Sequence, residues 1–122
     1  MSNPPQANPV VLVVEDEVLV RTCVVDQLAD AGFDVISAAE AEEALFAFQN
    51  HAGVTTLFTD ISMPGRFDGL ALAHKIFELR PTVQLILTSG HGEPKKCDMP
   101  AGVRFLPKPY DSGSLASLIK AA

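Results

Sequence analysis

Short apolar runs in this sequence end in polar residues that can do chemistry. These residues are Glu15 and Asp16 after the first run, then Asp60, Thr88 and Lys108 after three later runs. Short apolar runs bounded by turn residues are typical of buried strands, and strands buried on both faces belong to parallel sheets covered by helices. Because ligands bind outside the carboxyl ends of such strands, we expect these side chains to meet at one edge. Together they could hold a divalent cation and a phosphoryl group.

The carboxylates form a hard oxygen cluster that suits Mg²⁺, which is held by one or two carboxylates, waters and often a phosphate oxygen. Neighbours on a regular strand point to opposite faces, so Glu15 and Asp16 can both face the site only if the chain leaves strand geometry there. An alternative interpretation is that Glu15, Asp16 and Glu17 form a solvated helix start, favoured by the helix dipole.

Packing in the core does not explain a carboxylate at Asp60, which ends a buried run before a Met-Pro-Gly loop. Carboxylates can act as nucleophiles toward phosphorus and form an aspartyl phosphate, a transfer that mainly needs positioning and charge neutralisation. Lys108 would supply positive charge and Thr88 a hydroxyl donor. The alternatives are that Lys108 is a surface lysine extending past a strand end and that Thr88 packs as an ordinary β-branched strand residue.

Length and composition exclude several classes of protein. The 122 residues suit one domain, and a formal charge of −6 without a basic cluster argues against direct nucleic-acid binding. Two isolated cysteines do not make a disulfide framework or a zinc site. The start lacks signal-peptide features, and no apolar run approaches a membrane span. We therefore expect a cytoplasmic protein with a disordered tail over 1–8 and one domain over 9–122.

Strand-like and helix-like patterns alternate along the chain. The predicted strands are Val10–Val14, Asp34–Ala38, Thr55–Asp60, Val83–Thr88 and Val103–Leu106. The predicted helices are Glu17–Ala31, Ala41–Asn50, Gly69–Leu79 and Ser112–Lys120, the last capped by Asp111 or Ser112. This order indicates an α/β fold with a doubly wound, five-stranded parallel sheet of flavodoxin-like order 2-1-3-4-5.

The fourth crossover is the weak element of this pattern. Residues 89–102 contain three glycines and two prolines, and only Glu93–Met99 could form a turn or two of helix. We expect a short or irregular fourth helix that is more mobile than the other crossovers.

The whole set of motifs resembles the receiver domain of two-component response regulators, over nearly the whole chain and in the same order. The motifs are Glu15-Asp16, Asp60 with Met63-Pro64 and Asp68-Gly69, Thr88, and Lys108-Pro109. The set is more specific than its parts, and the likeness extends most to single-domain members and to receivers fused to sensor kinases. The loop over Met63–Gly69 is one residue longer than the common family pattern.

The resemblance implies a role for each site residue. Asp60 would accept a phosphoryl group from a phosphohistidine on a partner. Asp16 and Asp60 would bind Mg²⁺ directly, Glu15 through water, and the backbone carbonyl of Ser62 would be a further ligand. Lys108 would pair with the phosphoryl group.

The resemblance also implies a conformational switch and a special peptide bond. Thr88 and Phe105 would form the switch pair, in which the hydroxyl moves toward the phosphate and the ring turns inward. Such a switch is a packing change biased by one local charge. The Lys108–Pro109 peptide bond would be cis, although only about 5% of X–Pro bonds in folded proteins are.

The main hypothesis is therefore a phosphorylation-dependent switch, with a sensor histidine kinase or phosphotransfer protein as donor and a downstream protein as target. We expect a stand-alone monomer that is not an enzyme with a turnover substrate and that does not contact nucleic acid or membrane. The alternatives are a phosphate-independent docking module or a phosphorelay intermediate of the same fold. A small enzyme of related architecture fits less well, because no P-loop motif is present.

Overall fold

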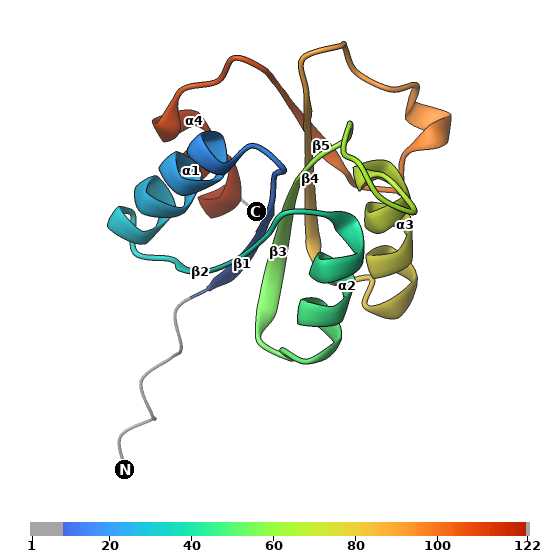
Figure 1. Ribbon diagram of the computed structural model, residues 1–122, viewed down its shortest axis with the longest axis horizontal. Helices are drawn as coiled ribbons and strands as arrows, with labels where there is room; N and C mark the ends of the chain where they lie inside the picture. Colours follow the sequence, from blue (N-terminus) through green and yellow to red (C-terminus); the bar gives the residue numbers. More distant parts are fainter. Residues whose placement is uncertain (1–8, 122) are drawn as a thin grey trace.

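The protein folds as a parallel five-stranded sheet between two layers of helices (Figure 1). The computed structural model describes residues 9–121, so the tail predicted over 1–8 lies outside the described residues. In chain order, the elements are β1 Val10–Val14, α1 Val18–Asp30, β2 Asp34–Ala38, α2 Ala41–Gln49, β3 Val54–Asp60, α3 Gly69–Leu79, β4 Gln84–Ser89, the 3₁₀ turn η1 Lys96–Asp98, β5 Arg104–Pro107 and α4 Ser112–Lys120. The strand order β2-β1-β3-β4-β5 confirms the predicted flavodoxin-like sheet.

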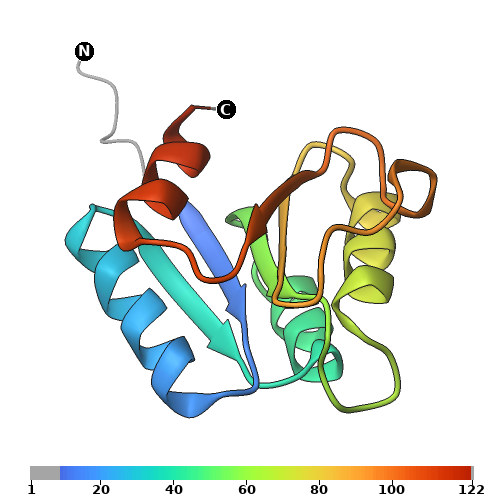
Figure 2. The same ribbon diagram turned by 90° about the horizontal axis from the view of Figure 1, so that it is seen from above.

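Helices α1 and α4 cover one face of the sheet, and α2 and α3 cover the other (Figure 2). Strand β1 is buried along its whole length, with Val11 and Val13 in the core beneath α1 and α4 and Leu12 in the core beneath α2 and α3. A strand covered on both faces has no solvent side, which explains its uninterrupted apolar sequence. Within residues 9–121, no helix has both the length and the apolar character needed to cross a bilayer.

Several predicted boundaries were wrong by one residue. Strand β3 begins at Val54 rather than Thr55, and β4 and β5 each lie one residue later than predicted. Helix α1 is one residue shorter at each end, and α2 ends at Gln49. Strand ends are set by pairing with the neighbouring strand, as in the register that matches Ser89 with Pro107, and an apolar run alone does not reveal that register.

The crossover between β4 and β5 contains only the 3₁₀ turn η1, which confirms the prediction of a short, irregular fourth helix. The Nε2 atom of His74, on α3, lies 2.7 Å from the backbone oxygen of Asp98 and attaches the turn to that helix. Pro100 is buried, whereas Phe105 on the adjoining strand β5 is only half-buried. The sheet is therefore covered less completely over its β5 edge than at its centre.

Helix α4 begins with a side-chain cap from Asp111, one of the two predicted candidates. Its carboxylate accepts hydrogen bonds from the backbone N–H of Ser114 at 2.8 Å and from the Ser114 hydroxyl at 2.9 Å. These bonds favour the ionised carboxylate, so they lower the pKa of Asp111. A carboxylate with a lowered pKa stabilises the fold above its ordinary titration range, and this contribution is lost as the pH falls.

We predict that Asp111→Ala lowers the melting temperature at pH 7, because α4 loses its N-terminal acceptor. The difference from wild type should shrink below about pH 4, where aspartate is ordinarily protonated. Asp111→Asn is the matched control, since it keeps an acceptor oxygen without the charge. Circular dichroism melts over a pH series measure the effect, and a difference that stays constant down to pH 3 would contradict it.

Candidate functional site

The first part of the site forms where β1 ends. The strand stops at Val14, and the N–H of Glu15 donates to the backbone oxygen of Ala38 on β2 at 3.1 Å. The chain then bends at Asp16, which is exposed, while the side chain of Glu15 is buried. The chain thus leaves strand geometry at this point, as it must if both carboxylates are to face one site.

Asp60 lies at the end of β3 with both carboxylate oxygens engaged. Its Oδ1 accepts a hydrogen bond from the backbone N–H of Ser62 at 3.0 Å, and its Oδ2 accepts one from Lys108 at 2.5 Å. The residue is only 7% exposed, so its carboxylate is largely shielded from solvent. Asp60 is paired with Thr88 of β4 in the sheet, which places the predicted hydroxyl next to it.

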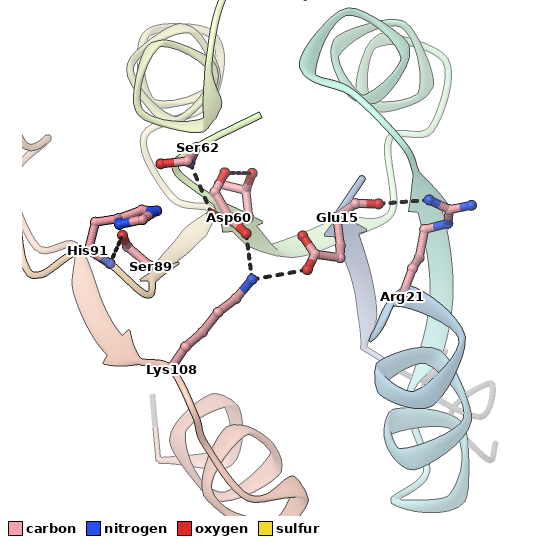
Figure 3. A network of polar contacts seen from close by, with 8 residues as sticks. Glu15, Arg21, Asp60, Ser62, Ser89, His91 and Lys108 are labelled. Carbon is pink, nitrogen blue, oxygen red and sulfur yellow. Dashed lines mark hydrogen bonds and ion pairs between the residues drawn. The ribbon is translucent and has the colours of Figure 1, made fainter. Parts of the chain in front are cut away.

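Lys108 connects the ends of β1, β3 and β5 (Figure 3). Besides Asp60, its Nζ donates to Oε1 of Glu15 at 3.0 Å, and its backbone N–H donates to the oxygen of Ser89 at 3.1 Å. Burial by itself lowers the pKa of Lys108, but the bonds to Asp60 and Glu15 outweigh that effect and raise it. The ammonium therefore stays charged. The Lys108–Pro109 peptide bond is cis.

Glu15, Asp16 and Asp60 form an acidic cluster in which one carboxylate oxygen from each residue lies within 4.8 Å of the other two. Burial raises the pKa of Glu15 to about 7, the ammonium of Lys108 opposes this rise, and the negative charge of Asp60 adds to it. Among the described residues, Oε2 of Glu15 is buried without a hydrogen-bond partner. A buried carboxylate oxygen without a partner is costly, and a hard divalent cation would satisfy it. The cluster therefore fits Mg²⁺.

The remaining predicted residues lie on β4, on β5 and in the loop after β3. Thr88 is buried, and its hydroxyl has no hydrogen-bond partner among the described residues. Phe105 packs half-buried against the core beneath α2 and α3. Ser62 is exposed and contributes its N–H to Asp60, while its carbonyl as a cation ligand stays a prediction. The structure brings together the carboxylates and the lysine, with the hydroxyl and the half-buried ring on the adjoining strands.

Arg21, which the sequence pattern did not indicate, also supports the site. This residue lies at the end of the first turn of α1, and its Nη1 donates to the backbone oxygen of Glu15 at 2.7 Å (Figure 3). It anchors the main chain at the bend that follows β1, where Glu15 enters the site. The only signal in the sequence is an arginine six positions after the first acid, which by itself is not distinctive.

A groove beside the site was also missed. It has a volume of about 710 Å³ and lies between α1 and the residues that follow β5, lined by Leu19, Val20, Cys23, Lys108 and Tyr110 among others. Its lining includes Leu19, which is 82% exposed. Tyr110 packs its ring edge-on against Phe58 at 5.6 Å, and burial raises its pKa to about 12. Lys108 belongs both to the lining of this groove and to the ion pairs with Glu15 and Asp60, so the groove lies beside the acidic cluster.

Comparison with known proteins agrees with this geometry. The family model described as response regulator receiver domain matches residues 11–120. The chain belongs to this family. Receiver domains of this family typically use Mg²⁺ and interact with histidine kinases or phosphotransfer proteins.

Individual relatives are multidomain proteins. The chain is 36% identical over 125 residues to the C4-dicarboxylate transport transcriptional regulatory protein DctD of Rhizobium meliloti, covering 95% of this chain and 25% of that protein. It is 35% identical over 114 residues to the sensor kinase CckA of Brucella abortus, covering 90% of this chain and 12% of that protein. This receiver domain therefore spans a quarter or less of the length of these relatives.

Solved receiver structures share the fold. The receiver domain of the hybrid histidine kinase CckA superposes with a TM-score of 0.78 at 35% identity, covering 92% of this chain and 96% of that one. A receiver domain protein from Clostridium thermocellum gives a TM-score of 0.85 at 25% identity, covering 93% and 92%.

We predict that Mg²⁺ raises the melting temperature, because a cation bound only to the folded acidic cluster shifts the unfolding equilibrium. At a concentration a hundred times the dissociation constant the gain is about 2.7 kcal/mol. Asp16→Asn should remove most of this gain, whereas Asp26→Asn, an exposed aspartate on α1, should keep it. Thermal melts with and without Mg²⁺ provide the measurement, and an equal gain in both variants would contradict the site.

Proposed function

We propose that this receiver domain accepts a phosphoryl group on Asp60 from a phosphohistidine of a sensor histidine kinase or phosphotransfer protein, in the cytoplasm and with Mg²⁺, and then changes a protein-interaction surface. The observation that carries this proposal is the buried carboxylate of Asp60, held between a charged lysine and two further carboxylates. The chain is itself the acceptor rather than a catalyst with a turnover substrate.

In the transfer, an oxygen of the Asp60 carboxylate forms a bond to phosphorus as the bond from phosphorus to the histidine nitrogen breaks. The histidine leaves with the electron pair of the broken bond. When bound, Mg²⁺ neutralises charge on the phosphoryl oxygens. Lys108 already contacts Asp60, so its ammonium is in place to hold the added phosphoryl group. The N–H of Ser62 keeps the other carboxylate oxygen in position.

Thr88 and Phe105 are proposed to report the phosphorylation. The unpartnered hydroxyl of Thr88 sits on the strand position paired with Asp60, where a phosphoryl oxygen could accept its hydrogen bond. Phe105 is only half-buried, so its ring can move inward when that hydroxyl moves. The orphan donor supplies the driving force, since a buried polar group gains by finding a partner.

The groove beside α1 is proposed to receive the phosphohistidine-bearing partner. Its apolar lining includes the strongly exposed Leu19, and Lys108 lies on its wall next to Asp60. A helix seated there would lie beside Lys108, from which a histidine on the helix surface could approach Asp60. An exposed apolar patch bordered by polar residues is typical of protein-interaction sites.

The decisive test is intact mass after incubation with Mg²⁺ and acetyl phosphate. Wild type should gain one phosphoryl group, with acetate as the leaving group, and Asp60→Asn should gain none because the amide is a poor nucleophile. Asp26→Asn is the control for removing one negative charge elsewhere. Uptake by Asp60→Asn would show that another residue is the acceptor. If wild type takes up nothing from acetyl phosphate or from kinases, the docking-module alternative replaces this proposal.

The segment between β4 and β5 should respond to phosphorylation. It contains only the turn η1, so we predict fast amide exchange over Gly90–Met99. Exchange there should slow when Asp60 is phosphorylated, because Thr88 and the start of this segment lie at the end of the same strand. Hydrogen–deuterium exchange measures both states, with the buried amides of β4 as the internal control. Exchange that is already slow and unchanged on phosphorylation would contradict this prediction.

A further inference from the structure

The main chain of Asp60 is held by contacts that do not involve its carboxylate. The hydroxyl of Thr59 donates to the backbone oxygen of Asp60 at 2.9 Å. Gly69, the first residue of α3, lies against the same oxygen, and a methyl group added to Gly69 would overlap it. The N–H of Gly69 donates to the oxygen of Ile61 at 3.0 Å. The start of α3 is thus seated directly on the end of β3.

The hydroxyl of Thr59 supplies a hydrogen bond at a place where the ladder between β1 and β3 has ended, although β3 still pairs with β4 there. The ladder between β1 and β3 ends with the pair Val14–Thr59, so Asp60 lies one residue beyond it. Asp60 is buried, and a buried backbone carbonyl needs a donor. The Thr59 hydroxyl meets that need within the same strand.

Packing alone does not account for a threonine at this position. The Thr59 side chain is fully buried, and alternation along β3 puts it on the same face as Leu57, which lies in the core beneath α2 and α3. A valine would fill nearly the same volume, favour a strand equally and avoid burying a hydroxyl. The hydroxyl is explained by its bond to Asp60.

We propose that Thr59 and Gly69 are positioning residues for the phosphoacceptor. Together they fix the orientation of the Asp60 peptide unit, and through it the place of the carboxylate between Lys108 and the N–H of Ser62. Gly69 does so by allowing the close approach of α3, and Thr59 by the hydrogen bond. This inference rests on the proposed function, in which Asp60 is the acceptor.

The test compares Thr59→Val, which removes the donor at nearly constant volume, with Thr59→Ser, which keeps it. Thr56→Val is the matched control, because Thr56 is also buried on β3 but donates to the side chain of Gln84. The rate of phosphoryl uptake from acetyl phosphate is measured at saturating Mg²⁺ by intact mass, as a function of donor concentration. Melting temperatures are recorded for all variants.

We expect Thr59→Val to lower the maximal uptake rate about tenfold, short of the roughly hundredfold loss that a 1 Å misplacement can cause. The donor concentration at half-maximal rate should stay unchanged, since the donor is not contacted. Thr59→Ser should recover most of the rate, and Thr56→Val should react like wild type even if it melts lower. Gly69→Ala should lose both uptake and stability.

A maximal rate of Thr59→Val equal to that of wild type, or a loss that Thr59→Ser shares, would overturn the positioning role. Affinity for Mg²⁺, measured by calorimetry, separates this outcome from failure of the proposed function. If wild type takes up no phosphoryl group but Thr59→Val still binds Mg²⁺ more weakly than Thr56→Val, the proposed function fails and the positioning role stands. Equal Mg²⁺ affinities in that case would overturn both.

Discussion

The shared ammonium of Lys108 is the interaction on which the rest of the site depends. Three carboxylates gathered within 4.8 Å would repel one another, and two of them are buried. Lys108 bonds to both buried members, Glu15 and Asp60, and so offsets the repulsion before any cation binds. Because the two carboxylates lie at the ends of β1 and β3 and the lysine follows β5, this contact joins β5 to two strands that are not its neighbours in the sheet. The carboxyl ends of β1, β3 and β5 are therefore connected through one side chain.

The strands that carry these residues are buried to different extents at the centre of the sheet and at its outer strand β5. At the centre, β1 is covered on both faces, and α3 rests on the Asp60 carbonyl through Gly69. At the edge, β5 is half-buried and the crossover before it holds only a 3₁₀ turn. The carboxylates consequently follow strands that are buried on both faces, while Lys108 follows a strand that is only half-buried. Such an arrangement suits a domain in which a change of charge at Asp60 moves β5 and the crossover before it.

Alternating patterns predicted the elements and the strand order correctly because each strand is a distinct apolar run between helix-like segments. The irregular fourth crossover followed from its glycines and prolines, which do not sustain a helix. Boundaries were less accurate. Val54 and Ser89 belong to strands because of their pairing partners, Val10 and Pro107, which are distant in the sequence.

By itself, the sequence determined which chemical groups meet at the functional edge, because parallel strands linked by helices must bring their carboxyl ends together. That rule predicts Glu15, Asp60 and Lys108 in one site, and the two ion pairs of Lys108 confirm it. Only the tertiary structure decided which charges pair and which buried oxygens lack a partner. It also revealed the roles of Arg21 and Thr59, which bond to backbone oxygens at the ends of β1 and β3. Those contacts depend on where each hydrogen-bond ladder stops, and this is set by the stagger of neighbouring strands rather than by local sequence.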